Sequence, residues 1–262
     1  MLSKLLKYDL KSKLPFLCIF YALAIGCAGL ARLFLLFSEI PILNIIGQIF
    51  SGAAISMIFN TLINNVLRAW GLFRQNLYGD PSYLTHTLPV RKPAIYLSKA
   101  LDGLITMTIS FLVSGLTLVI LYYGTKLWDT VALVLKALPD GRPALTVALV
   151  VGVVFLEVLN MLQCGFTGLI LGHKSNKGKI GFSVLIGLGV YSAGSLFVLG
   201  IFGAAALIDP NMRRFFMTSQ SSLFMLEDMH AVLALSAFAY AALIGILYGL
   251  NVKWLKQGVN VD

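Results

Sequence analysis

The sequence predicts an all-α membrane protein with about six transmembrane helices and with both termini in the cytoplasm. Of its 262 residues, 58% are hydrophobic and only 12% are charged, and the mean hydropathy is +0.88. A soluble domain carries about twice that share of charged residues. The apolar residues form long runs, and Lys and Arg lie in short clusters between them. Lipid is therefore the expected solvent for most of the chain.

Charge-poor intervals of sufficient length mark the expected spans, since a helix needs roughly 20 apolar residues to cross a bilayer. These segments must be helical, because the bilayer core offers no hydrogen-bond partner to an open backbone. The intervals run from Leu14 to Leu36, Ile40 to Leu67, Gly103 to Thr125, Pro143 to His173, Ile180 to Ile208 and Met229 to Val252. We assign residues 14–258 to one transmembrane domain of six helices.

The distribution of basic residues orients these spans. If the N-terminus is cytoplasmic and the helices alternate, most Lys and Arg residues fall inside, as the positive-inside rule requires. The residues that fall outside are Arg32, Lys126, Lys136, Arg142, Arg213 and Arg214. The basic residues form no single patch, so the net charge of +9 does not indicate nucleic acid as a partner.

Two segments outside the spans have helical patterns. Residues 1–13 place leucines on one side and lysines on the other, which predicts an amphipathic helix on the cytoplasmic membrane surface. The leucines are Leu2, Leu5, Leu6 and Leu10. Residues 126–138 carry Trp128 and Val131 at helical spacing, which suits an interfacial helix with an aromatic anchor.

Residues 68–102 form the longest expected cytoplasmic loop. Trp70, Phe73 and Leu77 recur at helical spacing, so the second span is expected to continue below the membrane until Gly79. Asp80 and Pro81 are a favourable N-cap and first residue for another helix.

This short helix is expected to run from Pro81 to Leu88 and to end before Pro89. It would display Tyr83, Leu84 and Leu88. One interpretation is a docking element that a cytoplasmic partner takes into a groove. The other is a folded loop that packs on its own helix ends.

The loop resembles a known family. Its sequence FRQNLYGDPSYLTHTLPV at residues 73–90, followed by LSK at 97–99, is similar to the signature of bacterial ABC-2-type permeases. The start KLLKYDL at residues 4–10 is also similar. These permeases are transmembrane subunits of ABC exporters in the bacterial plasma membrane. The resemblance implies export of an amphipathic peptide, antibiotic or lipid-like substrate, and a homodimer or a heterodimer with a related permease.

The resemblance also assigns roles to segments of the chain. It implies that residues 81–88 are the coupling helix and that the N-terminal segment is a connecting helix. Contact with a separate ABC ATP-binding subunit is then expected at the loop residues Phe73, Leu77, Gly79, Asp80, Pro81, Tyr83, Leu84, Leu88 and Pro89.

We expect no catalytic, cofactor or metal site in this chain. The segment GHKSNKGKI at residues 172–180 resembles a P-loop but has five residues between its glycines instead of four. Ile180 stands where a Mg²⁺-binding Ser or Thr is required. ATP and Mg²⁺ are therefore expected on the partner subunit.

Polar residues inside the spans are the other candidate sites. Glu157 lies in the middle of the fourth span, with Asn160 and Gln163 on a similar face. Glu157 could line a polar path for a cationic substrate, or it could be protonated or hydrogen-bonded between helices. Asn60 and Asn64, with Asn65 beside them, are expected to form hydrogen bonds between helices more than to bind a ligand.

Two pairs of glycines have the spacing of residues at helix contacts. Gly168 with Gly172, and Gly245 with Gly249, match a small-residue packing pattern that weakly suggests a dimer contact.

A secondary transporter without an ATPase is the alternative function, but the sequence has no clear inverted repeat. A membrane enzyme such as an intramembrane protease would need a nucleophile and base or a metal motif, and we find neither.

Overall fold

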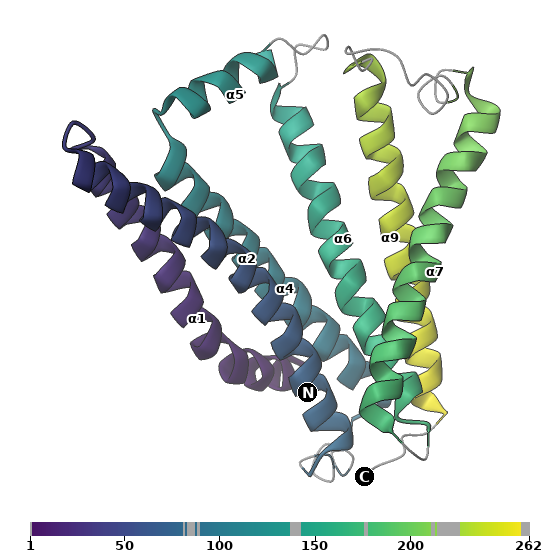
Figure 1. The fold of residues 1–262 in the computed structure, drawn as a ribbon. Helices are drawn as coiled ribbons and strands as arrows, with labels where there is room; N and C mark the ends of the chain where they lie inside the picture. The colour runs from purple at the N-terminus through teal and green to yellow at the C-terminus, as the bar shows by residue number, and fades with distance from the viewer. Residues whose placement is uncertain are drawn as a thin grey trace. The chain divides into compact units, whose positions relative to one another are not determined.

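Helices joined by short turns make up the residues that the computed structural model describes, which are 2–80, 82, 87, 90–136, 143–175, 178–210, 213 and 226–257. The helices are α1 (Leu2–Leu35), α2 (Pro41–Tyr78), α4 (Lys92–Tyr122), α5 (Lys126–Lys136), α6 (Pro143–Gly172), α7 (Lys179–Ile208) and α9 (Leu226–Lys256). Among the described residues, 6 helices are long and apolar enough to cross a membrane (Figure 1). The predicted fold class is confirmed, and α5 covers most of the expected interfacial segment.

The six long helices fall into two compact units. The first, Met1–Thr130, contains α1, α2 and α4, and the second, Val131–Asp262, contains α6, α7 and α9.

Small side chains allow the helices of the first unit to approach closely. Ala28, Ala31 and Ala54 are fully buried, and together with Leu121 they form a core cluster between α1, α2 and α4. A short turn over residues 36–40 reverses the chain between α1 and α2. Small residues at such contacts permit extensive van der Waals packing, which drives helix association in lipid.

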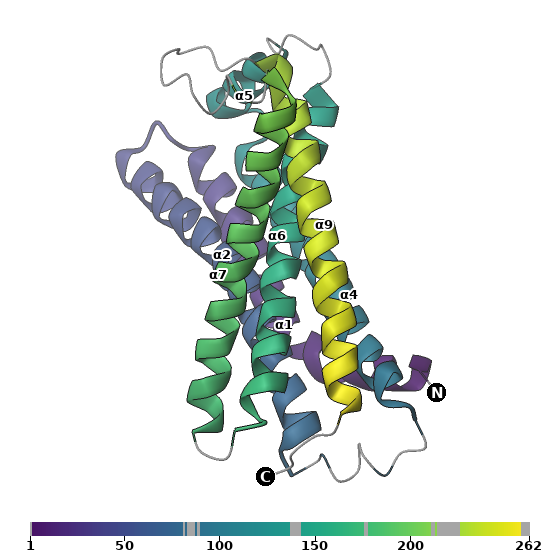
Figure 2. The same ribbon diagram turned by 90° about the vertical axis from the view of Figure 1, so that its right-hand side faces the viewer.

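Helix α1 is continuous from the N-terminal segment into the first span, and it contains Pro15. Proline removes a backbone donor and its ring displaces the preceding turn, so it bends a helix. Figures 1 and 2 show the N-terminal part of α1 running at a steep angle to the rest. Just beyond the bend, the guanidinium of Arg68 on α2 lies 5.3 Å from the ring centroid of Phe16.

In the second unit, α6 packs closely on α7 through glycines. A Cβ at Gly168 would collide with the backbone of Ser183 and Gly187, and a Cβ at Gly172 would collide with Ser183. The expected small-residue contact at Gly168 and Gly172 is thus made to α7 of the same chain. A second cluster joins this pair to α9 through buried Cys164, Val198, Ala239, Leu243 and Leu247.

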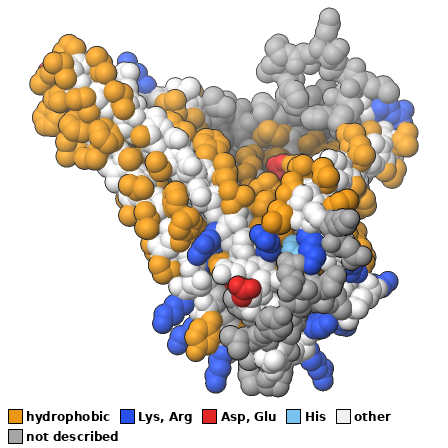
Figure 3. Space-filling view, turned by 60° about the horizontal axis from the view of Figure 1, so that its bottom comes forward, with side chains coloured by type: hydrophobic (Ala, Val, Ile, Leu, Met, Phe, Trp, Pro, Cys, Tyr) orange, Lys and Arg blue, Asp and Glu red, His pale blue; other side chains and the backbone are white. Residues whose placement is uncertain are grey.

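Large apolar side chains cover the outer faces of the helices. Ile49, Leu112 and Leu196 are each at least 65% exposed in the middle of long helices. In Figure 3, hydrophobic side chains cover the arm formed by α1 and α2. Such a surface is typical of helices that face lipid along their length.

Candidate functional site

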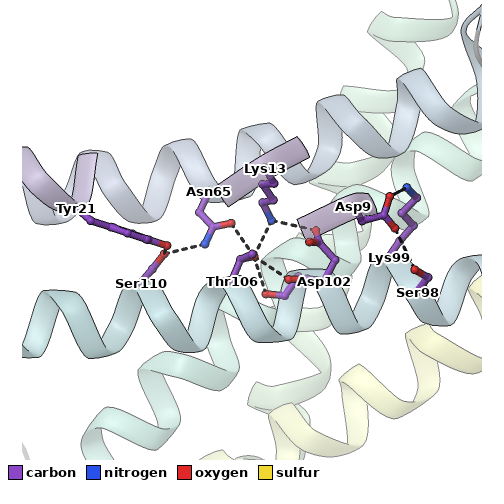
Figure 4. Close-up of polar contacts among 10 residues, drawn as sticks. Asp9, Lys13, Tyr21, Asn65, Ser98, Lys99, Asp102, Thr106 and Ser110 are labelled. Carbon is purple, nitrogen blue, oxygen red and sulfur yellow. Dashed lines mark hydrogen bonds and ion pairs between the residues drawn. The ribbon is translucent and has the colours of Figure 1, made fainter. Parts of the chain in front are cut away.

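A buried polar cluster lies where α1, α2 and α4 meet. The Nζ atom of Lys13 on α1 donates to Thr106 Oγ1 at 2.7 Å and to Asp102 Oδ2 at 3.4 Å, both on α4 (Figure 4). Lys13 and Thr106 are fully buried and Asp102 is 5% exposed. An ion pair so fully removed from water is uncommon, because each charge loses its hydration.

Hydrogen bonds extend this cluster along α4 to α2. Thr106 Oγ1 lies 3.1 Å from Asn65 Oδ1 on α2, and Asn65 Nδ2 donates to Ser110 Oγ at 2.8 Å. The Ser110 and Tyr21 hydroxyls are 2.9 Å apart, which returns the network to α1 (Figure 4). The chain of contacts thus joins all three helices of the first unit.

A second ion pair fastens the N-terminal part of α1 to the start of α4. Lys99 Nζ donates to Asp9 Oδ1, and Ser98 Oγ donates to Asp9 Oδ2 at 3.0 Å (Figure 4). Asp9 and Lys13 are one turn apart on α1, and Lys99 and Asp102 are about one turn apart on α4. On α1 the negative residue Asp9 precedes the positive residue Lys13. On α4 the positive residue Lys99 precedes the negative residue Asp102. Only one register of α1 against α4 therefore satisfies both pairs. We call these four residues the charge clamp.

The clamp is suited to positioning α1 against α4. Its two cations and two anions balance, and within the described residues no three His, Cys, Asp or Glu side chains could share a metal. Asp102 Oδ1 is buried and accepts no hydrogen bond from the described part of the chain. Because removing one member of a buried pair leaves an uncompensated charge, the clamp resists separation of α1 from α4.

Two patterns in the sequence indicate this cluster. The lysines of residues 1–13 are expected on the surface, but Lys13 is buried, because position 13 continues the helical stripe of Leu2, Leu6 and Leu10, which faces the protein. Asp102 belongs to a stripe of polar, buried residues at nearly every fourth position of α4, which also contains Ser98, Thr106, Ser110, Ser114 and Thr117. Such a stripe in an apolar helix indicates a face that contacts other helices.

Part of the expected coupling loop is described. Phe73 and Leu77 are buried at 0% and 1% exposure near the end of α2, which stops at Gly79 as predicted, and Asp80 is exposed. The expected contact residues Pro81, Tyr83, Leu84, Leu88 and Pro89 lie outside the described residues.

The helix ends on both sides of this loop are packed together. The ring of Phe73 at the end of α2 meets the ring of Tyr96 at the start of α4 edge-on, with centroids 6.1 Å apart. Tyr96 is fully buried, and Tyr78 and Ile95 are nearly so. We call this set of four residues the aromatic bracket. The contact of Phe73 with Tyr96 brings the two ends of the loop together.

The polar residues expected in the fourth span lie on α6. Glu157 is half-buried, and the Tyr191 hydroxyl on α7 lies 3.4 Å from its Oε1 atom. Asn160 is buried and accepts a weak hydrogen bond from the Cys164 thiol, and Gln163 is 7% exposed. The contact to Tyr191 favours the interhelical interpretation of Glu157 over a path for substrate.

The asparagines of α2 behave differently from expectation. Asn60 and Asn64 each donate to a backbone carbonyl one turn back in α2, at 3.0 and 2.8 Å. The interhelical bonds are made by Asn65, whose position is rotated about 100° from that of Asn64 and faces α4. The expected hydrogen bonds between helices are thus formed by Asn65, whereas Asn60 and Asn64 bond within their own helix.

Comparison of the chain with protein-family models, with curated proteins and with solved structures gives no significant match. The fold and the buried cluster define a multi-pass α-helical membrane protein. Its more particular function must be argued from its own residues.

Proposed function

We propose that the chain is the transmembrane permease subunit of an ATP-driven ABC exporter, powered by a separate ATP-binding subunit. The observation that carries this proposal is the aromatic bracket of Phe73, Tyr78, Ile95 and Tyr96 around the loop between α2 and α4. A loop with tightly packed ends transmits an applied force to both helices. A flexible connection between spans would not need such packing.

The charge clamp extends this mechanical path. Force that reaches the start of α4 passes to α1 through Lys99 and Asp102, which hold Asp9 and Lys13. The network through Asn65 includes α2 as well. The three helices of the first unit would therefore respond to the loop as one body. The similarity of residues 73–90 to the ABC-2 signature supports the same assignment from the sequence.

The proposed cycle uses this path to move the membrane helices. ATP binding closes a pair of partner ATPase subunits, which displace the segment at residues 81–88. The spans then change between inward-facing and outward-facing states and expel an amphipathic substrate. Hydrolysis and Mg²⁺ binding take place on the partner, and the permease acts with a second copy or a related permease in the bacterial plasma membrane.

Introduction of negative charge into the loop tests the proposal. Replacing Tyr83, Leu84 and Leu88 with Asp removes the apolar side chains that a groove would bind. We expect co-purification of a co-expressed ABC ATP-binding subunit to fall at least tenfold, and stimulated ATP hydrolysis to be lost. The control variant Thr130→Asp changes an exposed position on α5 and should bind the subunit normally. Unchanged association of the triple variant would exclude this docking site.

A further inference from the structure

The N-terminal part of α1 presents one basic face. Lys4, Lys7 and Lys11 are exposed, and Tyr8 between them is 71% exposed. These positions follow the spacing i, i+3, i+4 and i+7, so they lie along one side of the helix. We call them the basic face.

The charge clamp fixes the direction of this face. Asp9 and Lys13 point to α4, with which they form ion pairs, and the leucines at positions 2, 5, 6 and 10 are half-buried on the same side. In a helix of 3.6 residues per turn, the basic face is then directly opposite α4. The segment cannot rotate its lysines toward the protein without breaking two ion pairs.

The lysines of the basic face have no acidic partner among the described residues. Asp9, the acidic residue of this segment, is occupied by Lys99 and Ser98. Three unopposed positive charges within eight residues produce a strong local field. The long apolar run of the first span begins at Leu14, so these charges lie next to the membrane boundary.

We propose that the basic face of Lys4, Lys7, Tyr8 and Lys11 binds the headgroups of anionic phospholipids. The bend at Pro15 turns the segment away from the direction of the span (Figure 2). In this orientation the segment would lie along the membrane surface. A lysine near the membrane surface is attracted to anionic lipid headgroups. Tyrosine is enriched at the depth of the headgroups in membrane proteins. Because the leucines face α4, the lysines are the side chains that can contact lipid. This inference does not depend on an ATPase partner.

Lipid selectivity measured on the purified full chain tests the proposal. The chain is placed in phosphatidylcholine nanodiscs that contain spin-labelled phosphatidylglycerol or spin-labelled phosphatidylcholine. The immobilised fraction of each label gives the preference for the anionic lipid. We expect a preference for phosphatidylglycerol that weakens with salt. Each Lys→Gln change should lower it about fivefold at low ionic strength, from about 1 kcal/mol per lysine.

Three variants separate this site from general charge effects. The triple variant K4Q/K7Q/K11Q should lose the preference, while K4R/K7R/K11R should retain it. A matched control, R74Q/K253Q/K256Q, removes three exposed positive charges elsewhere and should retain most of it. All three should unfold at the wild-type temperature, because the altered side chains are exposed.

Several outcomes would overturn the proposal. A triple Gln variant with unchanged selectivity, or a control with an equal loss, would show that the basic face is not the lipid site. If the triple Gln variant kept its lipid selectivity but lost co-purification of the ATP-binding subunit, the face would bind an acidic protein surface instead. The lipid measurement uses the permease chain alone, so its failure is distinguishable from failure of the proposed transport function.

Discussion

At the residue scale, the pair of Lys13 and Asp102 illustrates how burial changes the contribution of a charged side chain to stability. Each side chain is almost completely excluded from solvent, and each compensates the other. A buried ion pair adds little net stability, because two hydrophobic residues of similar volume often stabilise the fold equally. Loss of one partner alone is different, since it leaves a charge with no counterion.

This asymmetry gives a prediction for the clamp. Lys13→Met alone and Asp102→Leu alone should each lower the free energy of unfolding by about 3–5 kcal/mol. The double variant Lys13→Met/Asp102→Leu should lose much less than the sum. Unfolding in mixed micelles with increasing denaturing detergent measures all three, and the double-mutant cycle gives the coupling. Additive losses would contradict a direct pairing of the two side chains.

The neighbouring residues Asn64 and Asn65 provide a second prediction at this scale. Asn65 bonds to Ser110 and Thr106 across helices, whereas Asn64 bonds within α2. Asn65→Leu should cost about 1 kcal/mol or somewhat more, as for interhelical hydrogen bonds in other membrane proteins. Asn64→Leu is the matched control and should be close to neutral in the same unfolding measurement. Equal effects would mean that the cross-helix bonds contribute nothing.

At the element scale, close approach of helices depends on the absence of side chains at particular positions. The backbones of α6 and α7 approach so closely at Gly168 and Gly172 that no Cβ fits. Gly245 and Gly249 on α9 show the same spacing, yet a Cβ there would meet no atom of the described chain within 4 Å. The spacing pattern alone therefore does not determine which glycines form a contact.

The difference between the two pairs is testable. Gly172→Val should separate α6 from α7 and lower the free energy of unfolding by about 1–3 kcal/mol or more, as overpacking does. Gly249→Val should leave the stability of the isolated chain almost unchanged. Thermal unfolding in one detergent compares them. A destabilising Gly249→Val and a neutral Gly172→Val would reverse the assigned packing.

At the scale of the whole molecule, the sidedness of the helices determines which loops a cytoplasmic partner could reach. The charge distribution predicts that the loop after α2 and the end of α9 share the cytoplasmic side, with α5 on the other. Within the first unit, the bracketed loop and the N-terminal part of α1 are joined through α4 by the charge clamp. The proposed function requires this side to be cytoplasmic.

Cysteine labelling tests that sidedness. In a chain with Cys18, Cys27 and Cys164 replaced by Ala, single cysteines are introduced at Arg74, Lys126 and Lys256. A membrane-impermeant maleimide added to intact cells should label Lys126→Cys only. Inside-out vesicles should show the opposite pattern. Labelling of Arg74→Cys and Lys126→Cys from the same side would exclude the proposed coupling role of the loop.

The sequence by itself determined the existence, type and approximate limits of the spanning helices. The end of α2 at Gly79 was predicted, because glycine and proline mark turns and the length of an apolar run marks a span. Both signals are contained in a short stretch of sequence. The rotation of each helix about its axis was not determined. In lipid, both the packed and the exposed face of a helix are apolar, so the hydrophobic pattern does not distinguish them.

Only the tertiary structure could therefore decide that Lys13 pairs with Asp102, that Asn65 and not Asn64 faces α4, and that Gly172 contacts α7 while Gly249 stays open. Each of these depends on which residues of distant segments meet. That choice is made by packing and by pairing of polar groups across helices, and no local window of the sequence contains both partners.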